Sequence, residues 1–228
     1  MFFDAHLEGS LAAADSLPNG LSGAILYNTS DLPVAPGHWL LAAAQDQIAE
    51  VSRNPAVKIV DVRIPPSELL ARLKRPKPEW FLLAEGVRVQ KQFLRLSLPP
   101  GASCVVGTKK LAEHFPQTRF LLNPFLHGPG DGWQAQVRLA ETENIWLTTL
   151  GLSPGPRCRW PRTEDVDEAL HFAMGEVGAS RLVYASGLSA SMYEFFLFDP
   201  QKWLADIKVL DEDQRALILD LNARELFG

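Results

Sequence analysis

The feature that most constrains this 228-residue chain is a recurring unit, in which a short and nearly continuous apolar run is followed by a segment with helical periodicity. Successive runs begin about two to three dozen residues apart, the spacing of strand–helix units. Seven such runs occupy residues 2–6, 23–28, 57–64, 93–98, 119–123, 145–150 and 181–186. Strands in a parallel sheet are covered on both faces and show this unbroken apolar pattern. The repeat therefore predicts an α/β fold with a parallel sheet.

Three of the intervening segments carry helix signals. Residues 38–53 have apolar side chains at helical spacing. Residues 164–177 follow a candidate cap at Thr163 and precede Gly178, a typical helix stop. Residues 211–226 begin with an acidic turn and place leucine and isoleucine on one face. We expect helices over these three ranges.

This alternation predicts a TIM-like (β/α) barrel, shortened, with seven or eight parallel strands, formed by residues 1–228 as a single domain. The chain is short for such a barrel, which typically has ~250 residues. The strand count stays open over residues 67–92, where 79–89 fit either a helix or an eighth strand. A shortened barrel would expose an apolar flank, and such a flank favours a homodimer.

Composition and charge exclude several classes of protein. The chain has 22 Lys and Arg against 27 Asp and Glu, a net charge of −5, and no basic cluster beyond residues 72–75. Nucleic-acid binding needs concentrated positive charge, so neither nucleic acid nor a membrane surface is an expected partner. No apolar run approaches ~18 residues, the start lacks signal-peptide features, and two cysteines are too few for a disulfide framework. We expect a cytoplasmic protein.

Four segments together resemble the amidohydrolase-related family (amidohydrolase 2 type), a group of TIM-barrel metal-dependent hydrolases and decarboxylases. Residues 3–8, Phe-Asp-Ala-His-Leu-Glu, are similar to the first-strand pattern Asp-Ala-His-x-His of that family. Residues 111–123 resemble the approach to its sixth strand, 143–152 its seventh strand, and 177–187 its last strand, which a C-terminal helix over 211–228 follows. The resemblance implies the same fold. A second resemblance, of residues 193–200 to a strand of ADP-ribosyltransferases, accounts for one strand and not for the strand–helix alternation.

The family holds its divalent metal with two histidines on the first strand, histidines on the fifth and sixth, and an aspartate on the eighth. Here His6 stands at the first position and Glu8 at the second. The fifth strand offers Ser97, the sixth Asn123, and the eighth Gly187. The metal lowers the pKa of a bound water and the aspartate accepts its proton. At most of these metal-ligand positions, this sequence has a different type of residue.

His6 and Glu8 remain as candidate catalytic residues and as a candidate metal pair, since histidine and a carboxylate together bind Zn or Fe. His127, in the loop after the sixth run, is the candidate third ligand. The competing interpretations are a solvated loop histidine for His127 and a hydrogen-bonded, metal-free histidine for His6. The residues therefore leave two alternatives open, one divalent ion (Zn, Mn or Fe) or no metal.

Polar side chains at the ends of the predicted strands are candidates for substrate binding, because barrel sites collect there. Arg63 could hold a carboxylate through a bidentate fork, or pair with a helix acid at the rim. The set is Arg63, Ser97, Asn123, Thr148 and Ser186. The resemblance implies a hydrolase or decarboxylase acting on a small carboxylate, lactone or amide. The alternative is a non-catalytic barrel that binds a small molecule or a protein partner, a pseudo-enzyme.

Overall fold

The computed structural model describes residues 2–8, 21–27, 38–43, 57–62, 65–74, 92–96, 98, 101–130, 132–154, 160, 162–188, 193 and 198–227. Its strands are β1 (Phe2–Glu8), β2 (Leu21–Tyr27), β3 (His38–Ala43), β4 (Val57–Val62), β5 (Phe93–Leu96), β6 (Arg119–Leu122), β7 (Ile145–Thr148) and β8 (Leu182–Val183). Its helices are α2 (Pro66–Lys74), α4 (Ala102–His114), α5 (Trp133–Arg138), α6 (Thr163–Glu176), α8 (Pro200–Ala205), α9 (Glu212–Ala216) and α10 (Asn222–Phe227). Short 3₁₀ turns η3 (Leu139–Glu141) and η4 (Ala179–Arg181) and a π-helical turn η5 (Leu217–Leu221) complete the elements.

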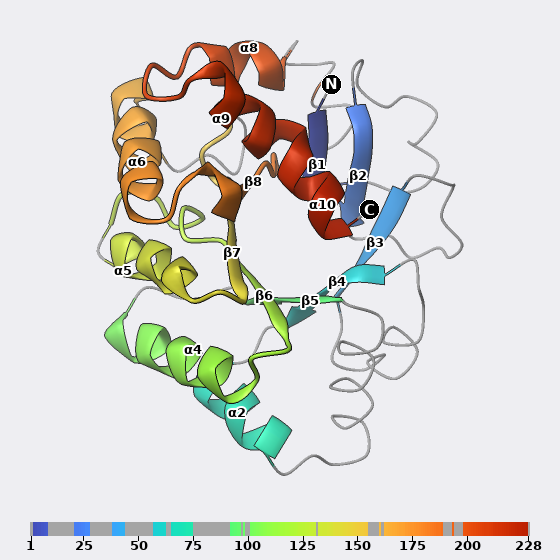
Figure 1. Cartoon of the computed structure of the whole chain (residues 1–228), viewed down its shortest axis with the longest axis vertical. Coiled ribbons are helices and arrows are strands. Elements are labelled where there is room, and N and C mark those ends of the chain that lie inside the picture. The colour runs from blue at the N-terminus through green and yellow to red at the C-terminus, as the bar shows by residue number, and fades with distance from the viewer. Residues whose placement is uncertain are drawn as a thin grey trace.

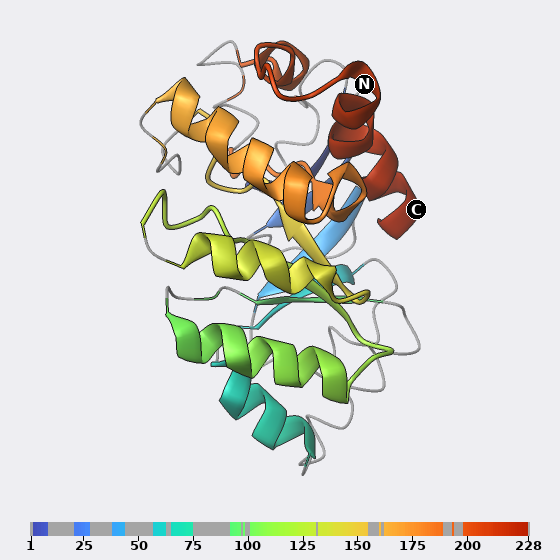
Figure 2. The same ribbon diagram turned by 60° about the vertical axis from the view of Figure 1, so that its left-hand side comes forward.

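Over these residues, eight strands form one sheet in the order of the chain, and each pairs in parallel with the next (Figure 1). The expected α/β fold with parallel strands is confirmed, and the sheet in the described part of the chain has eight strands. The helices α4, α5 and α6 lie side by side on one side of the strands (Figure 2). None of the helices in the described ranges is long and apolar enough to cross a membrane.

Alternate residues of each strand enter two different cores, as the pleat of a strand requires. Leu94, Phe120 and Leu147 pack with residues of the helices in the outer core. Phe93 and Leu121 belong to an inner core with residues of the neighbouring strands, closed at one end by Phe227 of α10. Both faces of the sheet are therefore covered, which explains the unbroken apolar runs in the sequence.

The two ends of the strand order, β1 and β8, lie next to each other. The turn η5 packs on both strands, and the main-chain N–H of Tyr184, just after β8, donates to the carbonyl of Ile218 in η5. Asp4 of β1 accepts a hydrogen bond from the main-chain N–H of Ser186, 3.0 Å away, in the segment after β8. The sheet therefore curves until its ends meet, as in a TIM barrel.

The helix expected over residues 38–53 is wrong at its start, because His38–Ala43 form strand β3. β3 pairs with β2 and β4 through Ile25↔Trp39 and Leu41↔Ile59. A short apolar run fits a buried strand as well as a helix face. Here the segment becomes a strand because it fills the gap between β2 and β4 and pairs with both. The eighth strand is thus β3, and residues 79–89, where an eighth strand was one alternative, lie outside the described part.

The other two expected helices are confirmed, with one change at a cap. Thr163 is the first residue of α6 and Arg162 occupies the cap position, so the expected Thr163 cap is wrong. Asp211 caps α9 by accepting the N–H of Gln214, whose side chain accepts the N–H of Asp211 in return. This reciprocal capping box fixes where the C-terminal helical segment begins.

Gly151, in the turn after β7, allows a close approach between two loops at the carboxyl ends of the strands. Its φ is +102°, and a Cβ atom there would lie 2.5 Å from the carbonyl oxygen of Phe125 and 2.9 Å from Leu126 Cα. We expect Gly151→Ala to lower the free energy of unfolding by about 2–3 kcal/mol through strain and backbone overlap. Gly175→Ala, in an open position of α6, should raise it by ~0.5–1 kcal/mol. Denaturant unfolding of both variants measures this, and equal effects would contradict the prediction.

Candidate binding site at the carboxyl ends of the strands

The carboxyl ends of the parallel strands lie at one end of the barrel, where active sites of this fold gather. Asn123 directly follows β6, Thr148 is the last residue of β7, and Ser186 lies three residues after β8. The backbones of His6 and Glu8 lie on β1. The side chains of His6 and Glu8, and residues Arg63 and Ser97, lie outside the described part of the chain.

Asn123 and Thr148 are in direct contact across neighbouring strands. The hydroxyl of Thr148 donates to Asn123 Oδ1 at 2.6 Å and accepts from the main-chain N–H of Leu150 at 3.3 Å. The side-chain amide of Asn123 is thereby oriented with its oxygen used and its nitrogen pointing elsewhere. Asn123 is 3% exposed, and its Nδ2 has no hydrogen-bond partner among the described residues. The pair presents a fixed, buried N–H donor.

Arg95 adds a second source of N–H donors inside the barrel. It lies on β5, two residues after Phe93 and therefore on the same inner face, and it is only 3% exposed. Its register partner on β6 is Leu121, two residues before Asn123. From the sequence, Arg63 was the candidate cation for substrate binding, and Arg95 was not identified. The available signal was a charge within an otherwise apolar strand, because arginine is seldom buried without a purpose.

A buried polar cluster, which we name the Asp4 cluster, joins Asp4, Tyr184, Ser186 and Tyr193. Besides the N–H of Ser186, the carboxylate of Asp4 accepts the hydroxyls of Ser186 at 2.5 Å and Tyr193 at 2.8 Å. The hydroxyl groups of Tyr184 and Tyr193 lie 3.0 Å apart. All four residues are buried. The cluster fixes β1 against the segment after β8.

Ser186, a candidate for substrate binding, uses its hydroxyl within the Asp4 cluster. That hydroxyl donates to Asp4 and accepts the main-chain N–H of Leu188 at 2.9 Å. Asp4 was not singled out from the sequence, although an aspartate in an apolar strand was visible there. Burial and the negative charge of Asp4 together raise the pKa of Tyr184 and Tyr193 well above the usual range, so both hydroxyls stay protonated.

His127 lies in the turn after β6 and is exposed. Among the described residues, no three His, Cys, Asp or Glu side chains are grouped as metal ligands would be. At the positions where the family holds its metal, Asn123 Oδ1 already accepts from Thr148, and Gly187 has no side chain. The usual binuclear site therefore does not fit the residues at the ends of β6 and β8.

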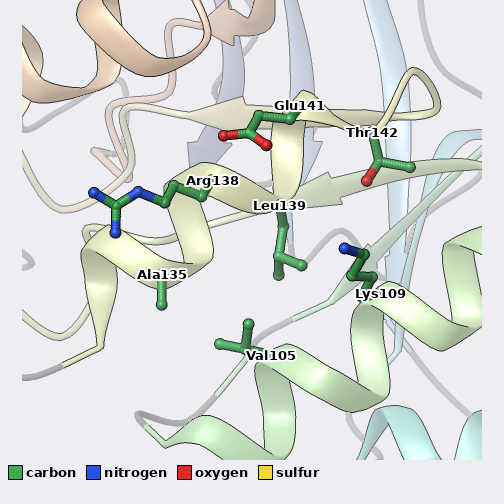
Figure 3. Close-up of a pocket in the computed structure, with 7 residues that line it drawn as sticks. All are labelled: Val105, Lys109, Ala135, Arg138, Leu139, Glu141 and Thr142. Carbon is green, nitrogen blue, oxygen red and sulfur yellow. The ribbon is translucent and has the colours of Figure 1, made fainter.

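A separate hollow of about 460 Å³ lies outside the barrel, between α4 and the α5–η3 segment. Figure 3 shows Leu139 between the two helices, with Val105 below it and Glu141 and Thr142 above. The full lining is Val105, Lys109, Ala135, Arg138, Leu139, Glu141 and Thr142. Thr142 precedes β7, so this pocket flanks the amino end of that strand and is not part of the site formed by Asn123.

Replacing Asp4 by asparagine tests the Asp4 cluster. Asp4→Asn keeps the size of the side chain but turns one acceptor into a donor that faces N–H and O–H groups. We expect it to lower the free energy of unfolding by about 3 kcal/mol, because it breaks a buried charge-assisted network. Tyr193→Phe, which removes one hydroxyl, should cost about 1 kcal/mol. Denaturant unfolding measures both, and a smaller loss in Asp4→Asn than in Tyr193→Phe would contradict the assignment.

The raised pKa of the two buried tyrosines predicts a loss of stability in alkali. An unfolded tyrosine ionises near pH 10, whereas Tyr184 and Tyr193 keep their protons in the folded state. The folded protein then binds more protons than the unfolded one, so their contribution to the free energy of unfolding falls as the pH rises above about 10. Phenolate absorbance of these two residues should appear only as the protein unfolds. Their ionisation in the folded protein, seen against the Tyr184→Phe variant, would show the prediction to be wrong.

Comparison of the sequence with protein-family models and with curated proteins finds no match. Solved structures do match over the whole chain. A "probable 2-pyrone-4,6-dicarboxylic acid hydrolase" from Acinetobacter baumannii with citric acid bound is 16% identical, with a TM-score of 0.65 over 100% of this chain and 99% of that one. An amidohydrolase from Burkholderia multivorans with bound zinc is 12% identical, with a TM-score of 0.60 over 100% and 99%.

A dihydroorotase from Campylobacter jejuni is 14% identical, with a TM-score of 0.66 over 99% of this chain and 82% of that chain. At these identities the likeness concerns the fold. It agrees with the parallel eight-stranded sheet and with the four sequence segments that resemble the amidohydrolase-related family. The chain therefore has the TIM-barrel fold of these amidohydrolase structures, which is the fold that its sequence predicted.

Proposed function

We propose that this protein, as one barrel domain over residues 1–228, binds a small molecule at the carboxyl ends of its strands without the usual binuclear metal site. The single observation that carries the proposal is the buried Nδ2 of Asn123, which has no partner in the described part of the chain and is held in place by Thr148. An unsatisfied buried donor costs roughly 1–3 kcal/mol, and a ligand acceptor at this point would recover that cost. The structure thus favours a ligand with a carbonyl or carboxylate oxygen.

The proposed ligand class is a small carboxylate, lactone or amide. Each offers an oxygen acceptor that suits the amide N–H of Asn123, and an anionic group would also be attracted by the buried guanidinium of Arg95. Solved structures of this fold hold small molecules, citric acid in one and HEPES in another. Binding by neutral and cationic donors is the chemistry that the described side chains support.

Catalysis is the further step of this proposal, and it rests on His6 and Glu8 of β1. Glu8 would serve as the general base in place of the aspartate that is Gly187 here, and His6 would orient it or polarise the substrate. With these two residues active, the protein is a hydrolase or decarboxylase. Without them it is a binding barrel. His6, Glu8 and His127 are also the candidate ligands for one divalent ion.

A ligand panel with matched variants tests the proposal. Carboxylates, lactones and amides are screened by thermal shift, and the affinity of any hit is measured by calorimetry. Asn123→Asp replaces the Nδ2 donor by an acceptor, so we expect a 10- to 100-fold weaker affinity, the value of one buried hydrogen bond. The control is His171→Ala, an exposed residue of α6 outside the site, which should bind as the wild type does. Equal affinity of Asn123→Asp and wild type would overturn the assignment.

Elemental analysis of the same preparations separates the metal alternatives. One equivalent of Zn, Mn or Fe that is lost in both His6→Ala and His127→Ala would establish a single-metal site and reject metal-free binding. Turnover of a panel member that is lost in Glu8→Gln, while ligand binding is kept, identifies an enzyme. Binding without any turnover identifies the binding barrel.

A further inference from the structure

The hollow between α4 and the α5–η3 segment, outside the barrel, has the size of a small-ligand site. Its volume of about 460 Å³ falls within the ~300–1,000 Å³ that is usual for such sites. Helix α4 contributes Val105 and Lys109, which are four residues apart and therefore share one face of the helix. Ala135 and Leu139 have the same spacing in the α5–η3 segment. Two helical faces therefore line the hollow.

Apolar side chains form the floor of this hollow. Leu139 is 4% exposed and belongs to the outer core. Val105, below it in Figure 3, is half-buried and packs against the same core. The core thus holds the floor in place, and an apolar group laid on Leu139 and Val105 would be removed from water.

Arg138 is a charged residue of the lining, and its charge already has a partner. Its guanidinium donates two hydrogen bonds of 3.1 Å to the carboxylate of Glu176 and lies 5.1 Å from the centre of the Phe172 ring. In Figure 3 it points away from Lys109. The pKa of Arg138 is raised first by Glu176 and to the smallest extent by the charge of Glu141. Arg138 therefore lines the hollow mainly with the stem of its side chain.

Lys109 and Glu141 are the other two charged residues of the lining. Both are exposed, and in the part of the chain that the structure describes neither takes part in an ion pair or a side-chain hydrogen bond, with each other or with a third residue. Figure 3 shows the ammonium group of Lys109 turned toward Leu139, and Glu141 above Leu139. Thr142 adds a hydroxyl group. The hollow thus offers one cation, one anion and one hydroxyl around an apolar floor.

We propose that this hollow binds a free α-amino acid with an apolar side chain. The carboxylate of the amino acid would meet Lys109 and the hydroxyl of Thr142, its ammonium group would meet Glu141, and its side chain would lie on Leu139 and Val105. A purely anionic ligand would be repelled by Glu141 and a purely cationic one by Lys109. A zwitterion satisfies both charges at once.

Ligand-observed NMR titration of the purified full chain with L-leucine, L-methionine and L-phenylalanine tests the proposal. We expect at least one of them to bind. Lys109→Gln and Glu141→Gln should each weaken its affinity by about 3- to 10-fold, because each removes one charged contact that is partly solvated. The N-acetyl form lacks the ammonium charge and the corresponding amine lacks the carboxylate, so both should bind more weakly by a similar factor. Glycine, which has no side chain for the floor, should also bind more weakly.

The matched control variants are Lys110→Gln and Glu143→Gln. Both residues are exposed neighbours of the two charged residues in the chain but do not line the hollow, so both variants should bind the amino acid as the wild type does. Asn123→Asp should also keep the full affinity, because the hollow flanks the amino end of β7 and is separate from the proposed ligand site.

Four results would overturn the proposal. In the first, none of the three amino acids binds to the wild type. In the second, Lys109→Gln or Glu141→Gln keeps the full affinity, or a control variant loses as much affinity as they do. In the third, the N-acetyl form or the amine binds as tightly as the free amino acid, which rejects a zwitterion. In the fourth, Asn123→Asp loses the affinity, which places the amino acid at the carboxyl ends of the strands.

Discussion

The carboxylate of Asp4 is the contact on which the closed shape of the sheet depends. It receives three hydrogen bonds, two from Ser186 and one from Tyr193, while it is fully buried. A buried carboxylate is tolerated only when its oxygens are satisfied in this way. Because Asp4 lies on β1, the same contact sets where that strand, and with it His6 and Glu8, stands relative to the ends of β6 and β7. The proposed chemistry of His6 and Glu8 therefore depends on how Asp4 holds β1 in place.

Much of the fold could be predicted, because the strands that follow one another in the chain also pair in the sheet. Their unbroken apolar runs reflect two cores, one on each face of the sheet. Strand β3 could not be identified, since its six residues fit a helix face equally well and only the gap between β2 and β4 decides. The Arg162 cap was missed for a related reason. The cap position depends on the direction from which the preceding chain enters the helix. In the local sequence, Thr163 matched the residue preference of a cap better than Arg162.

The candidate site was predictable in position and only partly in chemistry. Asn123 and Thr148 were expected near each other because the carboxyl ends of adjacent parallel strands meet. Their hydrogen bond depends on the register between β6 and β7, and no local pattern encodes that register. Asp4 and Arg95 were visible as charges inside apolar runs, but the local sequence does not say which partners surround such a charge. Their burial arises from strands and turns that are distant in the sequence.

Strand β6 runs from one end of the barrel to the other, since Arg119 is its first residue and Asn123 follows its last residue. Four residues of a strand span ~13 Å, and Leu121, between them on the inner face, is fully buried in the apolar inner core. That core keeps water and ions from passing between the ends, so each end must satisfy its own polar groups. Asn123 Nδ2, which has no partner among the described residues, is therefore separated by this core from Arg119, whose guanidinium lies over the Phe93 ring and donates to the carbonyl of Leu226.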